Sequence, residues 1–101
     1  LNFITLFLMT YIIIGDKMKE KLISEYVNRM TIDDVNNFAL KNGIILKDNE
    51  IKLIYDHIKT NWRTIVFGNP RGILDDLKSK LDNNSYQKIE ALYVYFKNLY
   101  L

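Results

Sequence analysis

The sequence offers few side chains for acid–base or nucleophilic chemistry, and these lie far apart along the chain. His57 is the only histidine, and the absence of cysteine rules out disulfides and thiolate metal ligands. A catalytic histidine needs a second group to orient it or to receive its proton, and a metal ion needs further ligands. The adjacent Asp56 points about 100° away from His57 on a helix. We therefore interpret His57 as a residue on the flank of a helix, beside Leu53 one turn earlier.

Two pairs of adjacent carboxylates are the next candidates for chemistry, Asp33 with Asp34 and Asp75 with Asp76. Neighbouring residues diverge on a helix, so neither pair forms a two-carboxylate site by itself. Asp33 and Asp34 fall in the first turn of a predicted helix, where negative charge complements the helix dipole. Residues 48–50 are too few for a calcium loop. From the sequence we predict a protein that is not an enzyme and that has no metal and no small-molecule cofactor.

Basic residues flank the one segment that clearly interrupts the helical pattern, residues 68–72, which contain two glycines and the single proline. Arg71 in this segment offers a bidentate donor for an anion. A predicted anion-binding or nucleic-acid-binding patch comprises Lys59, Arg63, Arg71, Lys78 and Lys80. Against this interpretation, the net charge is only +2 and no phosphate-binding loop sequence is present. A helix–helix connection with a solvated rim is the other interpretation.

Helices are predicted to position all of these residues, because apolar residues recur at spacings of three and four along most of the chain. The clearest stripe runs through residues 51–65 and predicts a long helix that begins near Asp48. Shorter stripes predict helices over residues 22–30, 35–39, 74–81 and 89–100. No run of residues alternates convincingly with a period of two. We therefore predict an all-α fold, a small bundle of four to five short helices.

Local sequence signals predict where these helices begin and end. Thr31 and Asp34 form a capping-box pattern, in which each side chain accepts a hydrogen bond from the other residue's backbone amide. Gly43 is placed to end that helix, because glycine tolerates the left-handed conformation at a helix end. Asn84 and Gln87 form a second candidate capping box, near the start of the last helix.

The last predicted helix carries more apolar residues than one buried face requires. Its main stripe includes Ile89 and Leu92, whereas Val94 and Tyr95 fall on the opposite side. An exposed aromatic–aliphatic pair is typical of an interface with another copy or another protein. Trp62 completes the stripe of the long helix and is interpreted as core, with an exposed anchor as the alternative. The predicted interaction surface comprises Val94, Tyr95 and Trp62.

The leading functional hypothesis follows from the surplus apolar surface on the last helix and from the lack of a catalytic pattern. It is a small, non-catalytic, cytosolic module for protein interaction or regulation, with a protein partner or a second copy of itself. The alternative is a weak nucleic-acid-binding helical module that uses the basic patch around Arg63 and Arg71.

The beginning of the chain differs from the rest, because residues 1–14 are almost wholly apolar and an ordinary charged sequence follows Met18. The stretch is shorter than the roughly 20 residues of a spanning helix and lacks the flanks of a secretory signal. The codons AUA GGA GAU AAA AUG for residues 14–18 would place a purine-rich ribosome-binding site before Met18. We therefore predict that residues 1–17 are a translated leader and that residues 18–101 form a single helical domain in the cytoplasm. The alternatives are a short membrane anchor and a folded N-terminal element, and membrane contact is expected only if residues 1–17 are retained.

A recognisable pattern lies between residues 28 and 58. It consists of Asn28, Met30, Thr31, Asp34, Val35, Phe38, Ala39, Ile44, Leu46, Glu50 and Ile54. In these residues the chain resembles the YqfT-like family of small proteins from low-GC Gram-positive bacteria. Members of that family are short, which agrees with a start at Met18, and they usually carry a hydroxyl residue at the position of Lys47. The family has no established activity, so the resemblance assigns no functional residue.

A looser similarity is to helix–extended–helix modules of the SAP kind, in the spacing of Thr31, Phe38, Gly43 and Leu46. Such modules present basic residues for phosphate contact at the start of their second helix. Here residues 48–50 include two carboxylates, which would repel a phosphodiester backbone. We interpret this similarity as shared geometry and not as a shared ligand.

Overall fold

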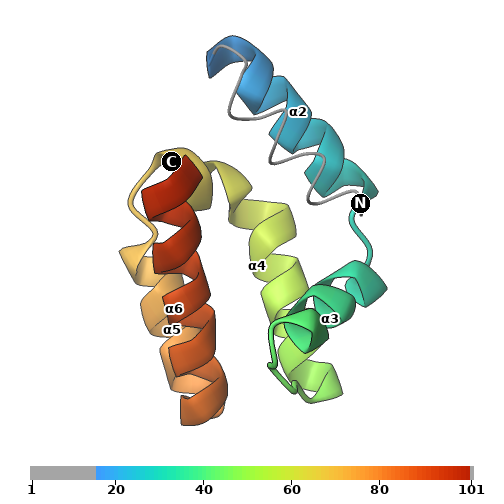
Figure 1. The fold of residues 1–101 in the computed structure, drawn as a ribbon, viewed down its shortest axis with the longest axis vertical. Coiled ribbons are helices and arrows are strands. Elements are labelled where there is room, and N and C mark those ends of the chain that lie inside the picture. The colour runs from blue at the N-terminus through green and yellow to red at the C-terminus, as the bar shows by residue number, and fades with distance from the viewer. Residues whose placement is uncertain (1–15, 101) are drawn as a thin grey trace.

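The computed structural model describes residues 16–100, which contain five α-helices and no strand (Figure 1). The helices are α2 (Asp16–Arg29), α3 (Ile32–Lys41), α4 (Asp48–Phe67), α5 (Arg71–Lys80) and α6 (Asn83–Tyr100). The prediction of a small all-α bundle is therefore confirmed. Of the predicted leader, residues 1–15 lie outside the described part, and residues 16 and 17 begin α2. No described helix combines the length and the apolar character that crossing a bilayer requires.

Helix α3 begins and ends at the predicted signals. Thr31 Oγ1 accepts a hydrogen bond from the Asp34 amide at 3.1 Å, and Asp34 Oδ2 accepts one from the Thr31 amide at 2.9 Å, so the capping box is confirmed. Gly43 has a φ of 73°, in the left-handed region that favours glycine. The next residue, Ile44, is 1% exposed. The turn at Gly43 therefore ends the helix and directs Ile44 into the core.

Helix α6 begins differently from the prediction. The Asp82 carboxylate accepts hydrogen bonds from the amides of Asn84 and Ser85 at 3.2 Å and 3.4 Å. Asn84 therefore lies inside the first turn of α6, and the capping box predicted for Asn84 and Gln87 is wrong. An ionised carboxylate accepts strongly from the amides of a first turn and also complements the helix dipole, which favours Asp82 as the cap.

Helix α4 bends at Asn61, where a φ of −124° and a ψ of 18° depart from helical values. The stripe through residues 51–65 predicted a continuous helix, and neither proline nor glycine marks the bend. Trp62 follows the bend and is buried against Ile23 and Val27 of α2. The part of α4 just after the bend thus holds α2 in place.

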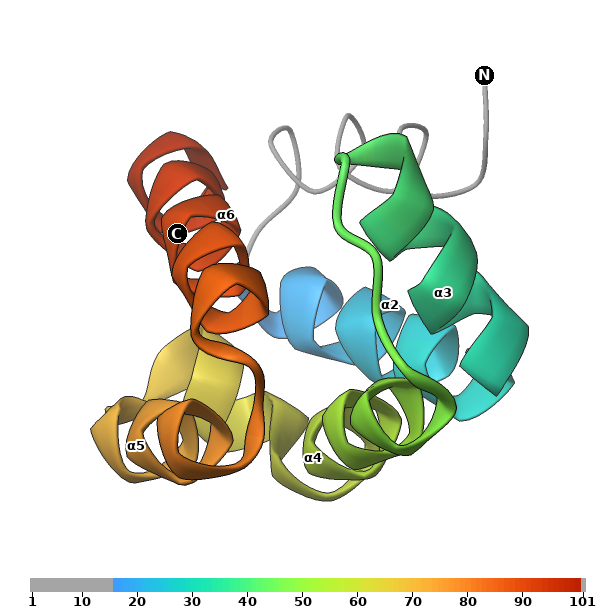
Figure 2. The ribbon, with the colours of Figure 1, turned by 90° about the horizontal axis from the view of Figure 1, so that it is seen from below.

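The five helices form two arms (Figures 1 and 2). We call α2, α3 and α4, with their connections, the first arm, because α2 and α3 each pack on α4. We call α5 and α6 the second arm, because α6 packs on α5. The arms join where α4 contacts α5, and among the described helices α6 does not pack closely on α2, α3 or α4. Figure 2 shows α3 and α6 standing on opposite sides, with α4 and α5 at the base.

The buried core is divided in the same way. Its three clusters are Ile23, Val27 and Trp62, between α2 and α4; Met30, Val35 and Ile51, between α3 and α4; and Leu77, Leu81 and Tyr86, in the second arm. A single domain usually has one contiguous core. Half-buried residues bridge the clusters, because Ile54 packs against both the α3–α4 cluster and the cluster of the second arm, and Ile58 packs against both clusters of the first arm.

Polar contacts connect the two arms away from these clusters. Glu50 at the start of α4 is 4% exposed, and its Oε1 accepts from the Lys47 amide at 2.9 Å. Its Oε2 accepts from the Asp82 amide, also at 2.9 Å. Lys88 Nζ on α6 donates to the Gly43 carbonyl at 3.1 Å. Glu50 thus caps its own helix and anchors the connection between α5 and α6.

Candidate functional site

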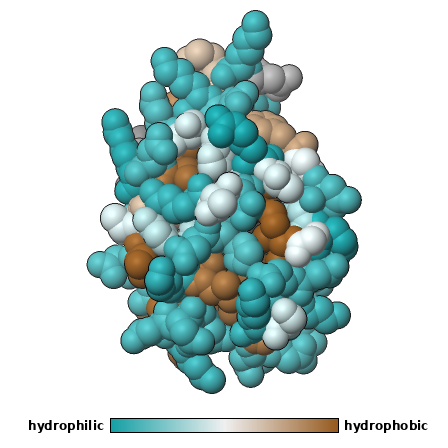
Figure 3. Space-filling view, turned by 180° about the vertical axis from the view of Figure 1, so that it is seen from behind, coloured by the Kyte–Doolittle hydropathy of each residue, from teal (hydrophilic) through white to brown (hydrophobic). Residues whose placement is uncertain are grey.

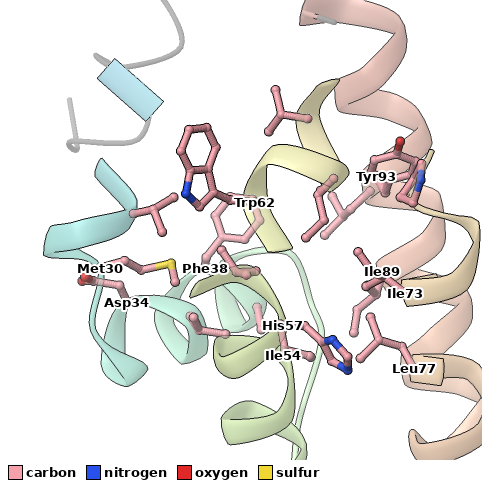
Figure 4. A pocket seen from close by; sticks show the side chains of 18 of the residues that line it. Met30, Asp34, Phe38, Ile54, His57, Trp62, Ile73, Leu77, Ile89 and Tyr93 are labelled. Atoms are coloured by element: carbon pink, nitrogen blue, oxygen red, sulfur yellow. The ribbon is translucent and has the colours of Figure 1, made fainter. Parts of the chain in front are cut away.

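An apolar groove of about 400 Å³ lies between the two arms (Figure 4). It is lined by Ile23, Tyr26, Val27, Met30, Asp34, Val35, Phe38, Ala39, Ile44, Leu46, Ile54, His57, Ile58, Trp62, Ile65, Val66, Pro70, Ile73, Leu74, Leu77, Ile89, Leu92 and Tyr93. All five described helices contribute to this lining. Figure 4 shows Met30 and Phe38 on one side of the space and Ile73, Ile89 and Tyr93 on the other. The groove therefore lies between the three core clusters, and residues of each cluster contribute to its lining.

The side chains that line the groove are mainly apolar. Apart from the indole of Trp62, the lining residues with a polar side chain are Asp34, His57, Tyr26 and Tyr93. Ligand sites in proteins commonly have volumes of about 300–1,000 Å³ and are lined mainly by apolar side chains with few polar groups. Such a lining favours an apolar occupant, because apolar surface gains free energy when it leaves water.

The structure joins His57 to Asp76, two residues that the sequence analysis treated separately. His57 Nε2 on α4 lies 2.8 Å from Asp76 Oδ2 on α5. Lys80 binds the same carboxylate, with its Nζ 2.9 Å from Oδ1. Hydrogen bonds from Lys80 and from His57 lower the pKa of Asp76 below its usual value. The interpretation of His57 as a helix-flank residue is thus incomplete, because it also links α4 to α5 and so connects the arms.

A histidine–carboxylate pair is one part of many nucleophilic and general-base sites. Here Lys80 shares the carboxylate, so Asp76 carries a structural ion pair as well. The nearby Ser79 hydroxyl donates to the Asp76 carbonyl at 2.7 Å. This hydroxyl is therefore engaged by the backbone of α5, and its contact does not extend the pair to a catalytic triad.

The five residues of the predicted basic patch contact different parts of the molecule. Lys59 donates to two backbone carbonyls at the end of α2. Arg63 pairs with a carboxylate of α2 at 3.2 Å and lies over the Trp62 ring, 4.3 Å from its centroid. Lys80 binds Asp76 as described above, and Lys78 is exposed without an ion pair within residues 16–100. Most of these cations thus already bind a carboxylate or a carbonyl group of the protein itself.

Arg71, the fifth cation, belongs to a polar network within the second arm. Its Nε lies 3.1 Å from Asp75 Oδ1, and its Nη2 donates to the Tyr86 hydroxyl at 3.3 Å. Tyr86 is 3% exposed and donates to Glu90 Oε2 at 2.7 Å. The hydrogen bond to Glu90, together with burial, raises the pKa of Tyr86. Arg71 therefore fastens α5 to α6.

The residues of the predicted interaction surface fall into two environments. Val94 and Tyr95 are 47% and 58% exposed, as expected for a surface. Trp62 is only 7% exposed, so its interpretation as core is confirmed and the alternative of an exposed anchor is wrong. Leu92 and Tyr93 line the groove, whereas Val94 and Tyr95 do not. Helix α6 therefore presents one apolar face to the groove and another to solvent.

The face of the molecule opposite to that in Figure 1 is mostly hydrophilic. On the face seen from behind, hydrophobic side chains reach the surface in several separate places and do not form one broad patch (Figure 3). Exposed apolar residues in small separate groups are ordinary for a protein surface. On this face the exposed apolar residues therefore mark no single docking surface.

Comparisons with known proteins identify no relative from which a function could be proposed. No family model matches the chain, and searches of curated proteins and of solved structures find no match either. The resemblance to the YqfT-like family therefore stays a prediction. Within residues 16–100, no group of three or more histidine and carboxylate side chains is arranged to hold a metal ion. The predicted lack of a cofactor likewise stays a prediction.

Proposed function

We propose that this protein is a small non-catalytic interaction module that binds an amphipathic helix of a partner protein in the groove between its arms. The observation that carries the proposal is the groove, which apolar side chains of five helices line and which separates α6 from the first arm. In helix-in-groove recognition, the apolar face of one helix enters a hydrophobic groove while its polar face stays in water.

The shape of the walls supports a helix as the occupant. The facing walls are themselves helices, with Ile58 of α4 on one side and Leu92 of α6 on the other, both half-buried. Side chains on such walls form ridges and grooves that accept the ridges of a further helix. Because both arms line the groove, a bound helix would hold them together.

We place this module in the cytoplasm of a bacterium. The composition supports this proposal, because the chain is free of cysteine and rich in isoleucine, lysine and asparagine, residues of AT-rich codons. A cysteine-free chain needs no oxidising compartment for its stability. Mass spectrometry of the native N-terminal peptide, recovered from fractionated cells, measures both the start of the chain and its compartment.

A matched pair of substitutions on α6 tests the groove. Leu92 lines it, whereas Val94, two residues later, is exposed and does not. The 1–101 chain is titrated with a synthetic amphipathic leucine–lysine helical peptide, and Trp62 fluorescence follows binding. Leu92→Lys should weaken binding by about tenfold or more, because the complex would bury a charge against hydrocarbon. Val94→Lys should leave the affinity unchanged, and equal affinities for the two variants would contradict the proposal.

A further inference from the structure

The inward face of α6 is only partly covered by the described helices, because Ile89 packs against the apolar cluster of the second arm but α6 makes no close contact with the first arm. Ile89, Leu92 and Tyr93 on this face line the groove, yet within residues 16–100 α6 packs on α5 alone. Across the groove, Ile58 and Ile65 of α4 are likewise only half-buried. Burial of apolar area is the main favourable term in folding. An apolar segment seated here would bury the half-exposed apolar side chains of both walls.

The chain itself contains such a segment outside the described residues. Residues 1–14 carry no charged side chain, and their only side chains with a polar group are those of Asn2, Thr5, Thr10 and Tyr11. Exposure of so apolar a stretch to water is costly and promotes aggregation. Its composition therefore matches that of the groove lining.

Connectivity places this segment beside the groove. Only Gly15 separates it from Asp16, where α2 begins, and Ile23 and Val27 of α2 line the groove. Fourteen extended residues reach about 45 Å. The longest dimension of the molecule is 37 Å, so every part of the groove lies within range. A short tether also gives a high effective concentration, which favours a segment of the same chain over a separate molecule.

We infer that residues 1–14 bind in the groove of their own chain and compete there with the partner helix. This regulation rests on the proposed function, because it acts at the same groove. It also requires that residues 1–14 be translated, which is the opposite of the predicted start at Met18. A chain that carries the segment then has an occupied groove, which a partner opens only by displacing it.

One tryptophan and no cysteine allow a single quencher to be set against a single fluorophore in the full chain. Trp62 lines the groove and is 7% exposed. A nitroxide attached to the Leu8→Cys variant should remove most of the Trp62 fluorescence. The same label on Lys78→Cys, an exposed position of α5 outside the groove lining, should remove little of it.

Dilution of the labelled chain separates contact within one chain from contact between two. Quenching that persists as the labelled chain is diluted supports the inference. Quenching that disappears on dilution overturns it in favour of a second copy as the occupant. A Leu8→Cys label that does not quench Trp62 overturns it outright.

The leucine–lysine peptide measures the competition itself. The double variant Leu6→Lys and Ile13→Lys should raise the affinity of the full chain for the peptide by about tenfold or more, because the tethered competitor is weakened. Asn2→Lys adds the same kind of charge at a polar position and should change the affinity little. An unchanged affinity in the double variant overturns the inference, while binding that is sensitive to Leu92→Lys preserves the proposed function. If the double variant binds no peptide, the proposed function fails and the competition fails with it.

Discussion

The two arms are held together by different kinds of interaction. In the first arm, two apolar clusters fasten α2 and α3 to α4. In the second arm, one apolar cluster is supplemented by the polar network of Arg71, Tyr86 and Glu90. Leu92 and Tyr93 in the apolar stripe of α6 line the groove, whereas Ile89 packs against the cluster of the second arm. The difference shows that an apolar stripe can serve a binding surface as well as a core.

The links between the arms are both apolar and polar. Leu53 and Ile54 of α4 pack against the apolar cluster of the second arm. Glu50 accepts from the Asp82 amide, and His57 contacts Asp76. Because the groove lies between the arms, these links hold its two walls at their observed separation. Substitutions in each arm and in the links therefore probe how independent the arms are.

Matched truncations in the two cores should have the largest effect. Ile44→Ala in the first arm and Leu77→Ala in the second should each lower the free energy of unfolding by about 3 kcal/mol, because each leaves a cavity. The two side chains are 1% and 5% exposed. Urea unfolding is followed by Trp62 fluorescence, which reports on the first arm, and by far-UV circular dichroism, which reports on all helices. If Leu77→Ala moved only the circular dichroism transition, the arms would unfold separately.

Removal of the buried link at Glu50 should have the next largest effect. Glu50→Ala should lower the free energy of unfolding by about 2 kcal/mol, because it leaves the Lys47 and Asp82 amides without their acceptor. Glu50→Gln keeps one acceptor oxygen and should cost less. Glu25→Ala, at an exposed position of α2, is the control and should change stability by less than about 0.5 kcal/mol. Equal costs for Glu50→Ala and Glu25→Ala would show that the link is unimportant.

The helix caps of the two arms should contribute similar, smaller amounts. Thr31→Ala at the start of α3 and Asp82→Ala at the start of α6 should each cost about 1 kcal/mol in urea unfolding. Asn84→Ala should cost less than Asp82→Ala, because Asn84 lies within the first turn. A larger stability loss for Asn84→Ala than for Asp82→Ala would support the capping box predicted for Asn84 and Gln87.

The polar contacts of Asp76, which join α5 to His57 of α4, should have the smallest effect, and that effect should depend on pH. The pKa of Asp76 is lowered in the folded protein, chiefly by Lys80 and then by His57. A carboxyl group of this kind stabilises the fold above its unfolded pKa, and the contribution disappears as pH falls through the folded pKa. The stability difference between the natural chain and Asp76→Asn should therefore be constant near neutral pH and shrink below about pH 4.

Thermal unfolding over a series of buffers measures this difference. Parallel pH profiles for the two proteins would mean that the Asp76 carboxyl has the same pKa in the folded and unfolded states. The Lys80→Met variant removes the main hydrogen-bond donor to the Asp76 carboxylate. Its stability should therefore fall less steeply with decreasing pH in acid than the stability of the natural chain.

Helices and most of their ends were predictable because they depend on residues only a few positions apart. The capping box of Thr31 and Asp34 needs neighbours three residues away, and Gly43 needs only its own backbone freedom. The bend at Asn61 was not predictable, because no proline or glycine accompanies it. The start of α6 was assigned to Asn84 because both Asp82 and Asn84 suit a cap, and the sequence does not rank them.

The sequence by itself determined the helical character of the chain and which faces are apolar, because periodic spacing expresses both. Only the tertiary structure decided what those faces meet. Asp82 lies 32 residues from Glu50, and Asp76 lies 19 from His57, and these contacts depend on how whole helices cross. An apolar stripe shows that a face avoids water but does not specify its partner. The stripe of α6 could therefore be recognised from spacing, whereas the groove that it lines required the arrangement of all five described helices.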